Sequence, residues 1–188
     1  MEVIMRKDLG AKPMLYPMPV LILGTYDENG NPNAMNAAWG GISEDREISV
    51  CISDTHKTAY NVVKSGAFTV SPADVDNLVA ADYVGIVSGN NEPDKIKKAG
   101  WTAVKSEKIN APLFAQLPFA LECELISYDP QTCRLVGKIV NVSADERILT
   151  DGKVDLAKFF PIVYEPCSHG YYSLGEKVGQ AFCDGKKI

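Results

Sequence analysis

Short apolar stretches separated by turn-forming residues dominate the first part of the chain. Residues 20–26 (VLILGTY) are apolar and β-branched, and the Asn-Gly turn of DENGNP joins them to residues 33–42 (NAMNAAWGGI). This combination predicts a β-hairpin. The return arm is rich in alanine and glycine where a strand normally carries bulky side chains, so we expect another group to approach its backbone closely.

The pattern then changes from strand to helix and back. Residues 47–53 (EISVCIS) alternate as in a half-buried strand, and residues 67–71 (AFTVS) resume strand character. Between them, THKTAYNVVKSG predicts a short helix, with Asp54 or Thr55 as its cap and Gly66 as its end.

Two more helices and a second hairpin are predicted in the remainder. The helices cover residues 74–83 and 94–99, with the loop SGNNEP between them. The hairpin pairs residues 119–128 (FALECELISY) with residues 133–142 (CRLVGKIVNV), and residues 162–164 form a further strand. Two long hairpins with short helical insertions predict an antiparallel barrel, and the lack of strict β-α-β order disfavours a Rossmann fold.

Composition narrows the class of protein. A chain of 188 residues corresponds to one domain, which we expect to span residues 1–188. The formal net charge of −5 disfavours nucleic acid as a partner, and the apolar runs are too short for a membrane span. Five well-separated cysteines without a CxxC pair do not form a disulfide or zinc framework, so we expect a reduced, cytoplasmic protein without a metal site.

Two segments are candidates for binding chemistry. The strand-to-helix junction SDTHKT combines free helix amides with hydroxyl, ammonium and imidazole groups, which suits a phosphate. The same residue types also occur at simple solvated helix caps, and that alternative stays open. The alanine- and glycine-rich arm suits close approach of a ligand, although a strand packed under a helix would look the same.

Other catalytic arrangements find little support. The chain has two histidines, His56 and His169, and neither lies in a nucleophile-elbow pattern. Cys167, Ser168 and His169 could form half of a metal site, but a second ligand pair is missing. The dinucleotide motif GxGxxG and the phosphate loop GxxxxGK[ST] do not occur, so a nucleotide cofactor would have to be held differently.

Taken in order, the segments resemble the flavin reductase-like, FMN-binding split-barrel family. The resemblance covers residues 17–185 and rests on these segments: PMPVLILGTYDENGNPNAMNAAWGG, EISVCIS, THKTAYNVVKSGAFTVS, DKIKKAG, INAPLF, LECEL, GKIVNV and YYSLGEKVG. It implies a mainly β fold with short helices, a six-stranded antiparallel Greek-key split barrel. It also implies a homodimer with FMN near the subunit interface.

The resemblance assigns nine residues to FMN. The isoalloxazine ring is expected to lie against the backbone of four consecutive residues: Asn36, Ala37, Ala38 and Trp39. The phosphate motif corresponds to Ser53, His56 and Thr58, and Lys95 and the aromatic Tyr172 complete the set. Relatives commonly carry arginine at the position of His56. An imidazole titrates near ~6.5, so this replacement makes phosphate affinity more dependent on pH, and Lys57 offers a compensating charge.

In a flavin enzyme the cofactor carries the chemistry, so no catalytic side chain is expected. The resemblance predicts an NAD(P)H-dependent oxidoreductase in which FMN accepts hydride at N5 from a visiting NADH or NADPH and passes electrons to an acceptor. An alternative is an FMN-binding electron carrier that a redox partner protein reduces, and an acidic chain suits a basic partner. A third alternative is a barrel without a cofactor.

Overall fold

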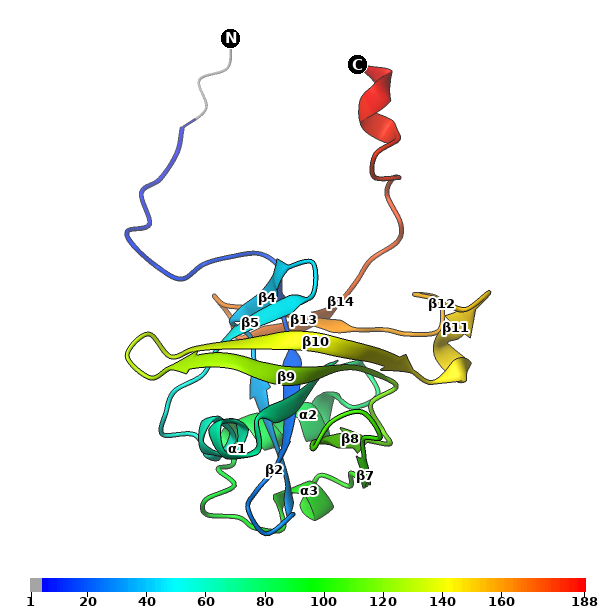
Figure 1. Ribbon diagram of the computed structural model, residues 1–188. Helices are drawn as coiled ribbons and strands as arrows, with labels where there is room; N and C mark the ends of the chain where they lie inside the picture. Colours follow the sequence, from blue (N-terminus) through cyan, green and yellow to red (C-terminus); the bar gives the residue numbers. More distant parts are fainter. Residues whose placement is uncertain (1–4) are drawn as a thin grey trace.

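A curved antiparallel sheet of seven strands forms the centre of the computed structural model, which describes residues 5–188 (Figure 1). In spatial order its strands are β3 (Pro32–Ala37), β2 (Leu21–Tyr26), β6 (Ala67–Pro72), β9 (Phe119–Asp129), β10 (Arg134–Ala144), β5 (Glu47–Cys51) and β4 (Gly40–Glu44). All neighbouring strands in this sheet are antiparallel. The predicted class, an antiparallel split barrel with short helices, is confirmed.

Smaller elements surround this sheet. A second sheet contains β1 (Met18–Pro19), β13 (Ile162–Glu165) and β14 (Gly170–Ser173). Two short hairpins pair β7 (Ala103–Lys105) with β8 (Pro112–Phe114), and β11 (Leu149–Thr150) with β12 (Lys153–Val154). The helices are α1 (Lys57–Ser65), α2 (Leu78–Ile86) and α3 (Lys95–Lys98), with 3-10 turns η1 (Glu146–Ile148) and η2 (Asp184–Lys187). In residues 5–188, no helix combines the length and apolar character needed to cross a membrane.

The small-residue arm, residues 33–42, forms two strands instead of the one predicted, and this accounts for a seventh strand in place of the expected six. Residues 33–42 were expected to form one strand, but the chain leaves the ladder at Ala38 and Trp39. The two halves, β3 and β4, lie at opposite edges of the sheet order. The arm therefore crosses from one edge of the curved sheet to the other at Ala38 and Trp39.

The helix boundaries are partly as predicted. Gly66 ends α1 with a φ of 71°, the left-handed conformation expected of a terminating glycine. The predicted cap at Asp54 or Thr55 was wrong, because His56 occupies the N-cap position. Helix α2 begins at Leu78 instead of residue 74, because residues 74–77 form a turn in which the Asp74 carboxylate accepts a hydrogen bond from the Asn77 backbone amide at 2.9 Å.

Both faces of β2 are buried, which explains its continuous apolar sequence. Leu21 and Leu23 face one core cluster, which includes the fully buried Phe68 on β6. Val20 and Ile22 face a second cluster beneath α2 and α3. Successive side chains of a strand alternate between faces, so an uninterrupted apolar run fits a strand with a core on each side.

We expect Gly24→Ala to lower the free energy of unfolding by roughly 1–3 kcal/mol or more, the cost of overpacking a filled core. A Cβ atom at Gly24 would lie 2.4 Å from Thr69 Oγ1 and 2.9 Å from the Pro112 carbonyl oxygen. Backbone of β8 cannot move aside as a flexible side chain can. Urea unfolding measures the effect. Gly41→Ala is the matched control, because a Cβ there meets nothing within 4 Å; equal unfolding midpoints for the two variants would contradict the packing argument.

Candidate functional site

Two adjoining cavities lie between β3, the start of α1 and the end of α2. The broad cavity has a volume of about 370 Å³, and the cationic cavity has a volume of about 190 Å³. Both are lined by Met35, His56, Gly85 and Ile86, so the two cavities adjoin, and together they are called the depression. Its size suits a small organic ligand.

Backbone and small side chains form one wall of the broad cavity. Residues 36–39, at the end of β3 and in the crossing to β4, line it. The side-chain Nδ2 of Asn36 donates to the Ala81 carbonyl at 3.1 Å and ties β3 to α2. A Cβ at Gly85 would lie 2.9 Å from Asn36 Cβ, so this contact depends on glycine. The small residues of this arm predicted that another group approaches its backbone closely. Helix α2 makes this close approach, and the broad cavity lies beside the contact.

Two tyrosines form another wall of the broad cavity. Tyr164 on β13 and Tyr171 on β14 are direct partners in the strand register, and both line the cavity. The Tyr171 hydroxyl donates to Asp82 at 2.8 Å. Burial, with this hydrogen bond as the next cause, raises the pKa of Tyr171 to about 12. The Tyr171 phenol therefore stays protonated at neutral pH, and the Asp82 carboxylate that accepts from it also lines the cavity.

The cationic cavity takes its name from two lysines. Lys95 is only 3% exposed, and its ammonium donates to the carbonyls of Val87 at 2.8 Å and Val84 at 3.2 Å. Burial, followed by the nearby charge of Lys57, lowers the pKa of Lys95 to about 8. A cation held beside a second cation in a partly desolvated cavity favours an anionic ligand.

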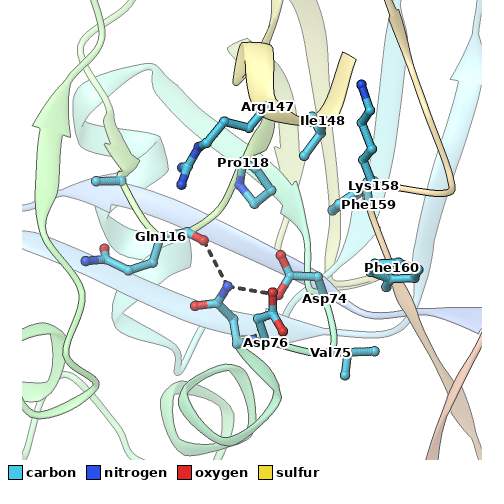
Figure 2. Close-up of a pocket in the computed structure, with 12 residues that line it drawn as sticks. Asp74, Val75, Asp76, Gln116, Pro118, Arg147, Ile148, Lys158, Phe159 and Phe160 are labelled. Carbon is cyan, nitrogen blue, oxygen red and sulfur yellow. Dashed lines mark hydrogen bonds between the residues drawn. The ribbon is translucent and has the colours of Figure 1, made fainter. Parts of the chain in front are cut away.

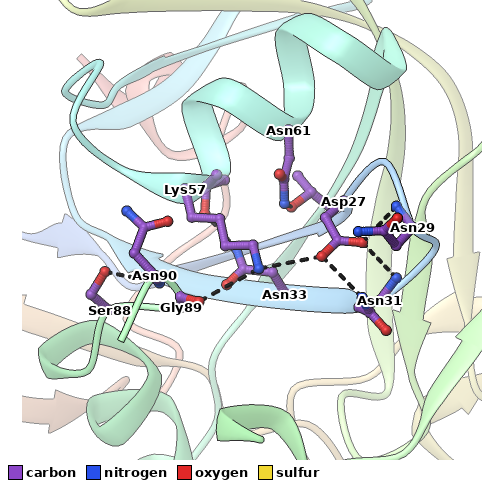
Figure 3. A network of polar contacts seen from close by, with 11 residues as sticks. Asp27, Asn29, Asn31, Asn33, Lys57, Asn61, Ser88, Gly89 and Asn90 are labelled. Atoms are coloured by element: carbon purple, nitrogen blue, oxygen red, sulfur yellow. Dashed lines mark hydrogen bonds and ion pairs between the residues drawn. The ribbon is translucent and has the colours of Figure 1, made fainter. Parts of the chain in front are cut away.

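Lys57, the second cation, is held at the first turn of α1 by two contacts that Figure 3 shows. Its Nζ lies 3.3 Å from Asp27 Oδ2 and 3.5 Å from the Gly89 carbonyl oxygen. Burial pushes the pKa of Asp27 upward, but hydrogen bonds from Asn31, Asn29 and Lys57 outweigh it and lower this pKa. Asp27 therefore stays ionised and fixes the Lys57 side chain next to the cavity.

Polar groups on β3 and α1 complete the cationic cavity. Asn33 Nδ2 donates to Thr58 Oγ1 at 2.9 Å, and both side chains are at least 97% buried. Asn33 Oδ1 is buried without a hydrogen-bond partner among the described residues. A Cβ at Gly89 would lie 2.3 Å from this oxygen, so glycine keeps the space beside it open. A buried acceptor without a donor is costly, and a ligand hydroxyl would satisfy it.

The structure brings seven of the nine sequence-predicted residues to this depression. Residues 36–39 line the broad cavity, Thr58 and Lys95 line the cationic cavity, and His56 lines both. Ser53 and Tyr172 line neither. The Ser53 hydroxyl lies 2.9 Å from the Thr55 hydroxyl at the exposed start of the helix, and Tyr172 is 55% exposed.

Sequence reasoning missed several lining residues: Asp82, Gly85, Ile86, Ser88, Gly89, Tyr164 and Tyr171. It included Asn33 and Met35 only as members of the small-residue arm. The pairing of Tyr164 with Tyr171 follows from the β13–β14 register, which a single sequence does not reveal. The loop at Ser88 and Gly89 did carry a signal, because its run of turn-forming residues directly precedes the lysine-bearing helix.

Comparisons with known proteins agree on one family. The family model described as "Flavin reductase like domain" matches residues 14–175. A solved structure of a flavoredoxin of Desulfovibrio vulgaris (Miyazaki F) is 38% identical, covers 96% of this chain and 100% of its own, and superimposes with a TM-score of 0.92. A flavoredoxin from Methanosarcina acetivorans shares the fold at 23% identity, covering 99% of both chains, with a TM-score of 0.85. An uncharacterized protein of Aeropyrum pernix is 33% identical over 116 residues, which span 60% of this chain and 43% of that relative.

Proposed function

Because the chain belongs to the flavin reductase-like family, we propose that it is an FMN-binding oxidoreductase whose two adjoining cavities hold the ring and the phosphate of one FMN. The observation that carries this proposal is that the two cavities adjoin and share four lining residues. A cavity lined by backbone, aromatic rings and the Asp82 carboxylate, which accepts from Tyr171, adjoins a pocket with two lysines and a buried hydroxyl. This polarity matches a flat isoalloxazine joined to a phosphate.

The residues present fit each part of the cofactor. The ring would lie against residues 36–39, with Tyr171 on another wall. The ribityl hydroxyls would supply the donor that Asn33 Oδ1 lacks. The phosphate would accept hydrogen bonds from Lys57, Lys95 and the Thr58 hydroxyl, whose oxygen already accepts from Asn33 and whose proton is free to donate.

When bound, FMN supplies the hydride and electron transfer, so the chain need only bind, orient and shield it. Trp39, at the broad cavity, is 54% exposed, which leaves room for a visiting nicotinamide to approach from solvent. We therefore favour NADH or NADPH as the electron donor, with electrons passing from the flavin to an acceptor.

Anaerobic stopped-flow mixing of the FMN-loaded protein with NADH and, separately, NADPH tests the reductase function. We expect at least one nucleotide to bleach the flavin absorbance much faster than it bleaches free FMN, the control. Bleaching no faster than free FMN with both nucleotides would reject the reductase function while leaving FMN binding intact.

A second candidate is an FMN-binding electron carrier that receives electrons from a protein. The net charge of −5 favours it, because an acidic surface suits docking to a basic redox partner. In the same experiment, this function predicts no bleaching by either nucleotide but rapid reduction once a basic reductase with its own donor is added.

We further propose that the chain forms a homodimer with the broad cavity near the subunit interface, as the family resemblance implies, and that the side of the cavity at Trp39 stays open to the nicotinamide. Ile86 lines this cavity and is 75% exposed. A large apolar side chain exposed at the cavity favours a protein interface beside it. Sedimentation equilibrium should give the mass of a dimer, and a monomer at micromolar concentration would reject this part of the proposal.

FMN affinity should fall as the pH rises through about 8. The free protein holds Lys95 with a pKa lowered to about 8, so it loses this proton above that pH. A bound phosphate favours the charged ammonium, so Lys95 must take up a proton when FMN binds at high pH. For one proton the dissociation constant should be about tenfold higher at pH 9 than at pH 7.

Quenching of flavin fluorescence measures this dependence. Riboflavin, which has the ring but lacks the phosphate, is the control and should vary far less over the same range. A dissociation constant for FMN that is unchanged between pH 7 and pH 9 would contradict the placement of the phosphate beside Lys95.

A further inference from the structure

Residues 174–188, here called the projecting segment, rise away from both sheets after β14 (Figure 1). Every residue of this segment is exposed. Within residues 5–188, no hydrogen bond or ion pair joins it to the rest of the chain. It nevertheless carries two large apolar side chains, Val178 and Phe182, which are 102% and 95% exposed. Removing such side chains from water is favourable, so the segment is suited to contact another surface.

The projecting segment has a local structure that holds Phe182 outward. The Gln180 backbone amide donates to Asp184 Oδ2 at 2.6 Å, and the Asp184 backbone amide donates to the Gln180 carbonyl at 3.1 Å. Phe182 lies inside this turn with a φ of 62°, a conformation that bulky residues rarely adopt. Strained backbone thus accompanies an aromatic ring in solvent, and burial of the ring on a partner would offset that strain.

Helix α2 has an apolar outer face that could receive such a ring. Its sequence, LVAADYVGI, contains one charged residue, and the core buries Ala81 and Val84. Val79 and Ile86 are 80% and 75% exposed, and their spacing of seven residues places them on one face of the helix. A helix that is apolar on all sides is normally buried, but nothing within residues 5–188 covers this face.

The turn before α2 extends this apolar surface. Figure 2 shows Val75 in this turn, with Phe160 nearby. The Val75 backbone amide donates to the Phe160 carbonyl at 3.0 Å, and both side chains are about half exposed. The outer face of α2 therefore continues into a second pair of apolar side chains, which gives a partner more than an isolated contact.

The charges of the two surfaces are complementary. Residues 74–86, which include α2 and the turn before it, contain three aspartates and no basic residue. The projecting segment contains three lysines and two carboxylates. Lys187 pairs with Asp184 at 2.7 Å, whereas Lys186 has no ion pair within residues 5–188. A basic segment and an acidic helix attract each other.

A second copy of this chain is the occupant that fits both surfaces. The projecting segment begins directly after β14, whose Tyr171 hydroxyl donates to Asp82 on α2. Ile86 on α2 lines the broad cavity, beside which we place the subunit interface. In a two-fold dimer, the same patch on each copy both gives and receives a contact, so one region of the chain can supply the segment and the helix that receives it.

We propose that the projecting segment of each copy lies on the outer face of α2 in the other copy, with Phe182 and Val178 packed against Val79 and Ile86. The inference rests on the proposed homodimer and adds the segment and the helix that hold it together. It also places part of the second copy next to the broad cavity, because Ile86 belongs to its wall.

Photocrosslinking of the FMN-loaded full chain tests the contact directly. With p-benzoylphenylalanine in place of Phe182, irradiation should produce a species of twice the chain's mass on a denaturing gel, and peptide mapping should place the crosslink within residues 75–86. A crosslink to these residues at the mass of a single chain would show that the segment folds back on its own helix. That result, or a crosslink to any other region, would overturn the proposal.

Sedimentation equilibrium of variants provides the second test. Phe182→Ser and Val79→Ser should each raise the dimer dissociation constant by at least about tenfold, the effect of losing an anchor side chain at an interface. Leu156→Ser is the matched control, because Leu156 is a 59% exposed apolar residue outside both surfaces, and it should change the constant by less than about threefold. All three side chains are largely exposed, so folding should not depend on them.

The outcomes separate this contact from the homodimer and from FMN binding. A dimer whose dissociation constant changes less than about threefold in Phe182→Ser would overturn the contact and leave the homodimer in place. A monomeric original protein would overturn both. FMN binding is measured independently by quenching of flavin fluorescence, so its failure would be recognised separately.

Discussion

Replacing Lys95 with methionine is expected to weaken FMN binding by about tenfold to hundredfold while leaving riboflavin binding within about threefold. Loss of a hydrogen bond from a charged donor costs about 1.5–3 kcal/mol, and here the donor lies in a cavity that excludes most solvent. Lys95 is 3% exposed, and its ammonium already has two carbonyl partners, so one N–H remains for a ligand. Because riboflavin lacks the phosphate, only FMN should respond.

The comparison of two flavins separates binding chemistry from damage to the fold. Methionine keeps the length and the apolar stem of lysine but leaves the carbonyls of Val84 and Val87 without their donor, so some loss of stability is expected. General damage would weaken FMN and riboflavin together. Lys98→Met is the matched control, because Lys98 lies on the same helix and is exposed at the surface in an ion pair with Glu92. An equal loss for both flavins in Lys95→Met would reject the phosphate placement.

Much of the fold could be predicted from the sequence, because patterns among neighbouring residues specify most of its elements. The Asn-Gly turn, the continuous apolar run of β2 and the long alternating arms of β9 and β10 each specify an element through nearby residues. The division of the small-residue arm into β3 and β4 escaped prediction. That division depends on which strands pair in the curved sheet, and small side chains carry no signal for a change of partner.

Some residues of the candidate site could be predicted from the sequence, and others could not. His56 and Thr58 lie at a helix start, and residues 36–39 belong to the small-residue arm, so local chemistry indicated them. The aromatic near the C-terminus was harder. Tyr171 and Tyr172 are neighbours in a strand and face opposite sides, and only the pairing of Tyr171 with Tyr164 shows which one lines the cavity. A shift of one residue reverses such an assignment.

Gly85→Val is expected to weaken FMN and riboflavin equally, by at least about tenfold, because overpacking costs about 1–3 kcal/mol and here it acts at the ring. A Cβ at Gly85 would lie 2.9 Å from Asn36 Cβ, so β3 or α2 has to shift. A shift of β3 moves the Asn36 backbone that we propose as the ring support, and a shift of α2 moves Gly85 and Ile86, which line the same cavity. It also disturbs the hydrogen bond from Asn36 Nδ2 to Ala81, which holds the two elements together.

Fluorescence titration with both flavins measures this effect, and the ratio of the two affinities is the informative quantity. Gly41→Val is the matched control, since a Cβ on that exposed strand meets nothing within 4 Å. Flavin affinities within about threefold of the original protein would show that the ring does not depend on the contact between β3 and α2. A loss of affinity for FMN alone would instead place the disturbance at the phosphate. That is the result expected for Lys95→Met. The two substitutions thus act on separate parts of one ligand, and only a flavin lying across both cavities produces an unequal loss in Lys95→Met and an equal loss in Gly85→Val.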